Sequence, residues 1–116
     1  MNGPEFPVDV WRTGLVAVVA PRGEIDLATV GALRAALRTE ETRPWVVLDL
    51  RHVEFMDSSG IGVVVEQMRR CEQDGLEFAV VRGPKHLHKL FRMVGLAERL
   101  VVLDDLPTAP EAGTAA

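Results

Sequence analysis

The sequence predicts a small α/β domain in which a mixed, mostly parallel β-sheet is flanked by amphipathic helices. Short, nearly continuous apolar runs alternate along the chain with segments whose apolar residues recur at helical spacing. Gly and Pro separate the two kinds of segment. The 116 residues, of which 47% are hydrophobic and 26% charged, suffice for one domain with its own core.

The strands are expected where β-branched and other large apolar residues cluster. The clearest runs are residues 15–20, 45–50 and 77–81, and a short last run covers residues 100–103. A further strand near residues 6–11 would pair with the first of these runs across a short turn and give the sheet one antiparallel edge. Because buried parallel strands need cover on both sides, we expect helices on the faces of this sheet.

Three segments show the apolar periodicity of helices. The first spans residues 27–39, with Asp26 as its expected N-cap. The second begins after Asp57, and its periodicity outweighs the strand propensity of three consecutive valines. The third lies between Pro84 and Gly95, residue types that favour the start and the end of a helix.

Composition and charge exclude several classes of protein. No apolar run approaches the roughly 20 residues of a membrane span, and the N-terminus lacks the basic stretch of a signal peptide. A net charge of −4 argues against nucleic-acid binding, and the single Cys71 fits a reducing compartment. We expect a cytoplasmic domain over residues 1–106 and a disordered tail, 107–116, that has too few large apolar residues to fold.

The most informative segment is Phe55-Met56-Asp57-Ser58-Ser59-Gly60-Ile61-Gly62. At a helix entrance, Asp57 and the two serines commonly do no more than cap the free backbone N–H groups. The same helix end also tolerates an added phosphate, because the first turn carries partial positive charge. A phosphoserine there would add about −1.5 to −2 charges and could switch a docking surface while leaving the fold intact. Gly60 and Gly62 would allow another backbone to approach closely, although their spacing is not that of a standard phosphate-binding loop.

Several blocks of the sequence, in this order, resemble the STAS domain and in particular its single-domain members, the anti-sigma factor antagonists. The resemblance covers residues 15–103, and the Met-Asp-Ser-Ser-Gly block is its most specific part. The blocks are Gly23-Glu24-Ile25-Asp26, Val46-Val47-Leu48-Asp49-Leu50, Val53, residues 55–62 and Gly95-Leu96.

This resemblance implies a binding protein without catalysis, metal or cofactor. The unphosphorylated antagonist would bind an anti-sigma factor that is also a serine kinase, and so release a sigma factor. Phosphorylation of Ser58 would end the binding, and a metal-dependent serine phosphatase would restore it. The residues expected to contact the partner are Glu24, Asp26, Asp57, Ser58, Ser59, Gly60, Gly62 and Val63. Periodicity leaves open whether Val63 is buried against a neighbouring helix or exposed for a partner.

Other roles of the same fold remain possible at this point. The chain could be a cytoplasmic STAS subunit of an ABC-type lipid transporter, a component of a stress-signalling scaffold or, with less support, a GTP-binding domain. Hydrolysis by Ser58 is disfavoured because the block lacks the G-x-S-x-G pattern. The family commonly ends with a helix after the last strand. Here the Asp104-Asp105-Leu106-Pro107 segment and its sequel lack apolar spacing, so this helix is expected to be short or absent.

Overall fold

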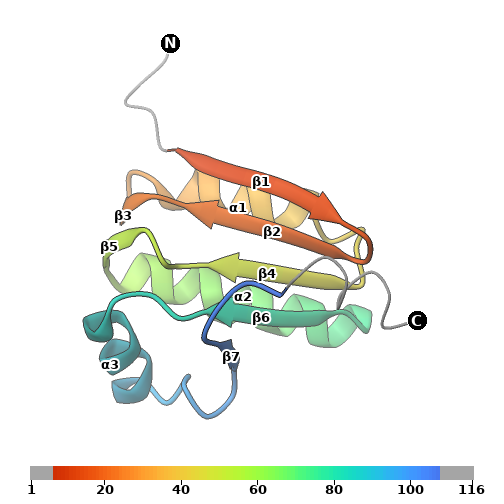
Figure 1. Ribbon diagram of the computed structural model, residues 1–116. Coiled ribbons are helices and arrows are strands. Elements are labelled where there is room, and N and C mark those ends of the chain that lie inside the picture. Colours follow the sequence, from red (N-terminus) through yellow and green to blue (C-terminus); the bar gives the residue numbers. More distant parts are fainter. Residues whose placement is uncertain (1–6, 108–116) are drawn as a thin grey trace.

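A computed structural model describes residues 7–107 of the chain (Figure 1). The elements are β1 (Val8–Thr13), β2 (Val16–Pro21), β3 (Gly23–Ile25), α1 (Val30–Thr39), β4 (Trp45–Asp49), β5 (Val53–Met56), α2 (Ser58–Asp74), β6 (Glu77–Val81), α3 (Lys85–Met93) and β7 (Val101–Leu103). All the strands and helices expected from the sequence are present. The two short strands β3 and β5 were not expected.

Five strands form one mixed sheet in the order β1-β2-β4-β6-β7. β1 runs antiparallel to β2, with Val10 opposite Val19, whereas the other three pairings are parallel. The expected antiparallel edge is therefore confirmed. β2 and β4 lie inside the sheet, so nearly all their residues are buried, which explains their continuous apolar sequence.

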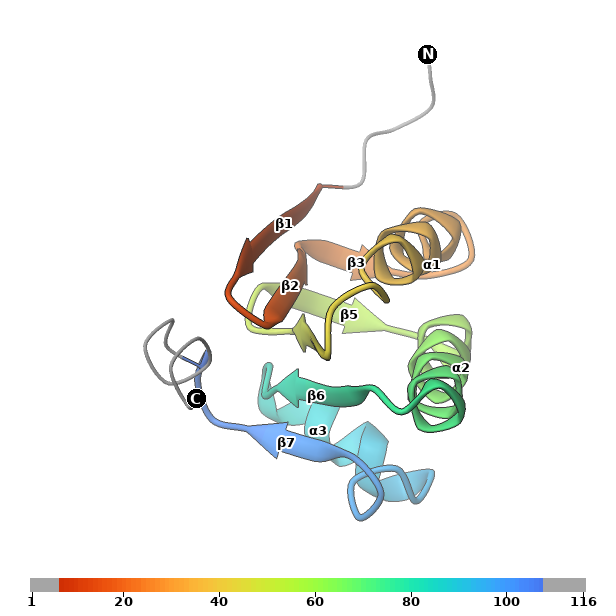
Figure 2. The ribbon, with the colours of Figure 1, turned by 90° about the vertical axis from the view of Figure 1, so that its right-hand side faces the viewer.

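The three helices pack on one face of this sheet. In Figure 1, α1 and α2 lie behind the strands, and in Figure 2 the same two helices lie together on the right. Leu33 of α1, Val64 of α2 and Leu87 of α3 join Leu48 and Val80 of the sheet in one buried cluster. The expectation of helices on both faces is thus wrong for residues 7–107.

The opposite face of the sheet is covered by the chain that returns after β7. A second buried cluster there includes Val47, Ala79 and Val81, and Leu103 and Leu106 pack against it. Figure 2 shows this segment on the side of the strands away from α1 and α2. The buried residues of this cluster are valines and an alanine, so a short length of chain can approach this part of the sheet closely.

Two ion pairs tether this returning segment. Arg51 contacts Asp105 at 3.2 Å, and Arg82 contacts Asp104 at 3.1 Å. Residues 104–107 are not helical, which agrees with the expectation of a short or absent closing helix as far as the structure describes the chain. The expected tail, 107–116, lies outside the described residues except for Pro107.

The helix boundaries follow the local sequence with one exception. α2 begins after Asp57, as expected, and ends at Gly75, whose φ of 72° is the left-handed conformation that favours glycine. α1 starts at Val30 instead of Leu27, because Asp26 closes a turn and does not cap the helix. Within residues 7–107, every helix is too short or too polar to cross a lipid bilayer.

Candidate functional site

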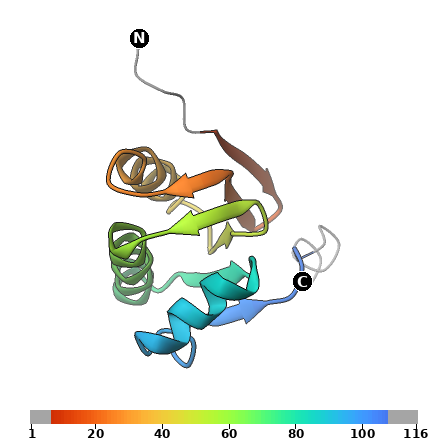
Figure 3. The ribbon, with the colours of Figure 1, turned by 90° about the vertical axis from the view of Figure 1, so that its left-hand side faces the viewer.

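A second, two-stranded parallel sheet positions the two loops that the sequence singled out. β3 pairs with β5, so that Glu24 lies opposite Phe55 and Ile25 opposite Met56. Figure 3 shows these strands side by side, leading into α1 and α2. The backbone N–H of Asp57 donates a hydrogen bond to the Ile25 carbonyl at 3.1 Å, which ties the two loops together. Glu24 on β3 and the turn that follows it therefore adjoin the entrance of α2.

Asp57 caps α2 with its side chain. Its carboxylate accepts hydrogen bonds from the backbone N–H of Ser59 at 2.9 Å and from the Ser59 hydroxyl at 2.7 Å. The hydroxyl bond is the main reason why the pKa of Asp57 lies below its usual value, with help from the backbone N–H groups of the first turn. The expectation that both serines cap the helix is therefore wrong, and Asp57 is the capping residue. Asp57 accepts, and Ser59 donates to it.

Ser58 is exposed at the first position of α2. In the described part of the chain, none of the side-chain hydrogen bonds involves its hydroxyl, whereas Ser59 is engaged by Asp57. A group attached to the Ser58 oxygen would leave the cap of the helix in place. It would project into solvent next to the partial positive charge of the first turn.

Gly60 has a structural role that the sequence did not reveal. It is buried, and a Cβ at this position would lie 2.5 Å from Met56 Cγ and 2.8 Å from Ile25 Cγ2. Glycine here lets α2 pack closely on the small β3–β5 sheet. The expectation that Gly60 admits a partner is wrong, because the space beside it is occupied by the protein itself. Gly62 is exposed, with open space around it, and remains accessible.

Val63 must also be removed from the expected contact surface. Its side chain is only 1% exposed and belongs to the main core cluster. α2 packs against both the sheet and α1, so its buried stripe is wider than a helix with a single neighbour would need. The alternative that Val63 is buried is the correct one.

Two apolar side chains at this site were not expected to be exposed. Phe55 on β5 is 47% exposed, because it points away from the core while its neighbour Met56 is buried. Leu27, in the turn before α1, is 82% exposed. Alternation along β5 could not have suggested the first, because Glu54 and Phe55 are both exposed between buried Val53 and Met56, and the second depended on the helix starting late. We call the surface formed by Glu24, Leu27, Phe55, Ser58 and Gly62 the switch face.

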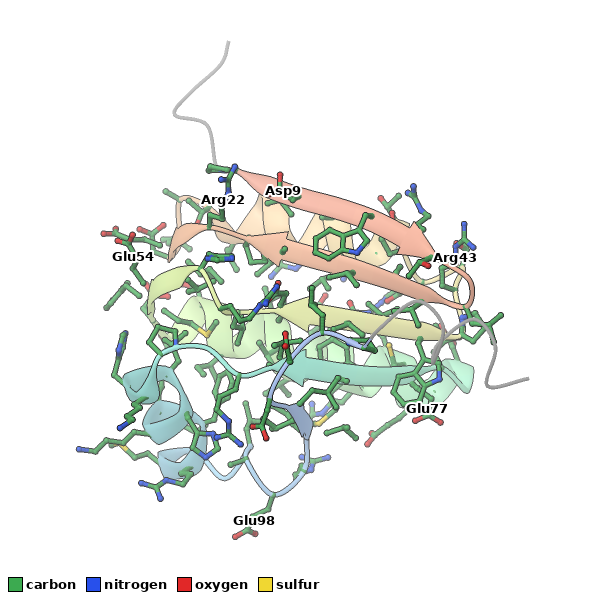
Figure 4. All side chains as sticks on the ribbon, viewed as in Figure 1. Asp9, Arg22, Arg43, Glu54, Glu77 and Glu98 are labelled. Carbon is green, nitrogen blue, oxygen red and sulfur yellow. The ribbon has the colours of Figure 1, made fainter. Side chains whose placement is uncertain are left out.

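The described residues contain no group of three His, Cys, Asp or Glu side chains arranged to hold a metal ion. The His86 ring is instead engaged with the backbone, since its Nε2 lies 2.7 Å from the Glu54 carbonyl oxygen of β5. This contact joins the start of α3 to the strand that leads to Ser58. The Glu54 side chain projects outward at this end of the molecule (Figure 4).

Comparison with known proteins identifies the family. Residues 8–112 match the sequence model of the STAS domain, and the chain belongs to this family. Among curated proteins it is similar to the anti-sigma F factor antagonist of Paenibacillus polymyxa, with 32% identity over 93 residues, 78% of this chain and 80% of that protein. It is also 33% identical over 78 residues to the anti-sigma-B factor antagonist of Listeria monocytogenes, 66% of this chain and 68% of the relative.

Solved structures agree with this assignment. An anti-sigma factor antagonist from Mycobacterium paratuberculosis superposes with a TM-score of 0.73 and 27% identity, over 96% of this chain and 93% of that one. The unphosphorylated anti-sigma factor antagonist SpoIIAA has a TM-score of 0.68 and 23% identity, over 88% and 90% of the two chains. At the latter identity the likeness concerns the fold, which is the mixed α/β fold that the sequence predicted.

Proposed function

We propose that this protein is an anti-sigma factor antagonist whose binding is switched off by phosphorylation of Ser58. The proposal is supported by the names of its curated relatives. The observation that carries it is the separation of roles at the entrance of α2. Asp57 and Ser59 hold the helix end, while Ser58 is exposed and has no side-chain partner among the described residues. A kinase can therefore modify Ser58 without dismantling the fold.

The switch works through the difference between a hydroxyl group and a phosphate dianion. A partner that docks on the switch face packs around the small neutral Ser58 side chain. A phosphate in the same place must lose much of its hydration and has no paired donors on a surface shaped for a hydroxyl. A penalty of about 4 kcal/mol would weaken binding by roughly a thousandfold.

The partner in this proposal is an anti-sigma factor with serine kinase activity. It binds the unphosphorylated protein, releases its sigma factor and then transfers the γ-phosphate of ATP to Ser58. A metal-dependent serine phosphatase returns the protein to its binding state. The chain supplies the substrate hydroxyl and the docking surface, and the catalytic groups belong to the other two proteins. Sigma factors act on RNA polymerase, so this role places the protein in the cytoplasm.

The proposal is tested by incubating the protein with ATP and the anti-sigma kinase of the same organism and locating the phosphate by mass spectrometry. We expect a single phosphate on Ser58. Ser58→Ala should bind the kinase and resist release by ATP, and Ser58→Asp should bind at least tenfold more weakly with a thermal midpoint close to that of the wild type. The matched control is Ser59→Ala, which keeps the acceptor hydroxyl and should still be phosphorylated.

Three results would contradict the proposal. Ser58 could remain unmodified with every kinase of this class in the organism, or Ser58→Ala could still be released by ATP. Copurification with an ABC-type ATPase and with no sigma regulator would instead favour a transporter subunit. A sulfate transporter family protein from Wolinella succinogenes shares the fold, with a TM-score of 0.72, but its 22% identity supports no further likeness.

A further inference from the structure

The outer side of α3 carries a stripe of positive charge. Lys85, Lys89 and Arg92 are spaced at i, i+4 and i+7, so they share one face of the helix. Met93 continues this face and is 74% exposed. Figure 4 shows nitrogen-tipped side chains that project from α3 away from the sheet. These four residues form the basic stripe.

The two lysines of the basic stripe work against the stability of their own helix. Like charges one turn apart repel each other, and Lys85 lies in the first turn, where the helix dipole disfavours a cation. The first turn of α3 has no acidic residue. Seven arginines elsewhere in the described chain have an acidic partner, but within residues 7–107 no ion pair includes Lys85, Lys89 or Arg92. Arg92 lies in the last turn, where the helix dipole favours a cation, but neither this effect nor an ion pair accounts for Lys85 and Lys89.

The surroundings of the stripe indicate which kind of partner it fits. The apolar side of α3, with Leu87 and Phe91, is buried in the core, so the helix cannot lay an apolar face into a lipid bilayer. Outside α3 the chain has ten basic and 17 acidic residues, which would repel an extended anionic surface such as a membrane or a nucleic acid. A partner protein with a small acidic patch would contact only the stripe and would not face the acidic remainder of the chain.

We infer that the basic stripe docks on an acidic surface of the anti-sigma factor, with Met93 packing into an apolar depression beside it. This inference rests on the proposed function. It is supported by the link from α3 to the switch face, because His86 contacts the backbone of β5, the strand that ends at the α2 entrance. The stripe steers the partner toward the face that contains Ser58, so it acts mainly on the rate of association.

The test measures association of the unphosphorylated protein with the anti-sigma factor by stopped-flow fluorescence at about 50 and 300 mM NaCl. The variant Lys85→Glu/Lys89→Glu/Arg92→Glu should associate at least tenfold more slowly than the wild type at low salt, and its rate should depend less on salt. Its thermal midpoint should stay close to that of the wild type, because the like-charge repulsion within α3 only changes sign, while Glu is favoured in the first turn at position 85 and disfavoured in the last turn at position 92.

A matched pair of single variants separates the stripe from the overall charge of the protein. Lys89→Glu and Arg69→Glu change the net charge equally, and both residues are exposed, but Arg69 lies on α2. Lys89→Glu should slow association severalfold, and Arg69→Glu should change it less than twofold. Met93→Ser should speed dissociation, with little effect on the association rate.

Each other outcome has a definite meaning. If the wild type does not bind the anti-sigma factor, the proposed function itself fails and the inference falls with it. If the wild type binds and the triple variant associates equally fast, or if Arg69→Glu slows association as much as Lys89→Glu, only the inference is overturned. It is also overturned if the wild type, but not the triple variant, sediments with vesicles of 30% phosphatidylglycerol in phosphatidylcholine while association is unchanged.

Discussion

The two helices that follow the small β3–β5 sheet begin in different ways. At α2, Asp57 has an extended backbone and directly precedes the helix, so its carboxylate caps the first turn. At α1, Asp26 comes four residues before the first helical residue, and its carboxylate accepts from the N–H groups of Ala28 and Thr29 within a turn. The same residue type thus caps a helix in one loop and closes a turn in the other, depending on its distance from the helix.

This difference determines what each loop can present to a partner. The direct start of α2 leaves Ser58 as an exposed helical residue in a fixed position. The longer entrance of α1 places Leu27 outside the helix, where it is exposed. One loop therefore offers a modifiable hydroxyl on a rigid frame, and the other offers an apolar contact on a turn.

A glycine near the start of each helix provides the strongest test of this comparison. Gly60→Ala should lower the free energy of unfolding by about 1–3 kcal/mol, because the new Cβ would overlap Met56 and Ile25 and push α2 away from the small sheet. Urea denaturation would measure the loss. Gly62→Ala is the control, since a Cβ there meets open space. Equal stabilities of the two variants would show that the close packing of α2 on the sheet is not needed.

The corresponding change in α1 should have the opposite sign. Gly31 lies in the first turn of α1, with nothing within 4 Å of an added Cβ. Gly31→Ala should raise the free energy of unfolding by about 0.5–1 kcal/mol, because alanine loses less backbone entropy in a helix. The same urea experiment measures it. A loss of stability would mean that the start of α1 needs the flexibility of glycine, and the contrast between the two entrances would disappear.

The sequence predicted the parts of this fold that local patterns control. The main strands, α2 and its Asp57 cap follow from apolar periodicity and from the preference of short polar side chains for helix ends. β3 and β5 have only three and four residues, too few for a periodic signal, and they pair across an intervening helix and strand. The sequence also did not show that the helices cover only one face of the sheet. This arrangement depends on the path of the chain after β7, which covers the other face.

The candidate site was predicted to a similar extent. The Asp-Ser-Ser-Gly block indicated Ser58, but the roles of its neighbours depend on tertiary contacts. Val63 is buried because α1 lies beside α2, and Gly60 is required because Met56 and Ile25 lie beneath it. These packing contacts cannot be read from the block itself. The prediction based on it therefore included more residues in the partner surface than are accessible.

The smallest expected effect concerns the titration of the α2 cap. Ser59→Ala removes the hydrogen bond that does most to lower the pKa of Asp57, so this pKa should rise toward the ordinary value of about 4, as measured by carboxyl NMR. Thr29→Ala, which removes a hydroxyl at the entrance of α1, is the matched control and should leave the pKa of Asp57 unchanged.

The sign of the accompanying stability change follows from linkage. A carboxyl whose pKa is lowered by folding stabilises the protein above its unfolded pKa of about 4, and this contribution is lost as the pH falls through the folded value. The wild type should therefore be more stable than Ser59→Ala at pH 7, and the difference should shrink as the pH drops below about 4. A difference that stayed constant with pH would mean that Ser59 supports α2 through packing, in which case Asp57 alone would hold the helix end on which the freedom of Ser58 depends.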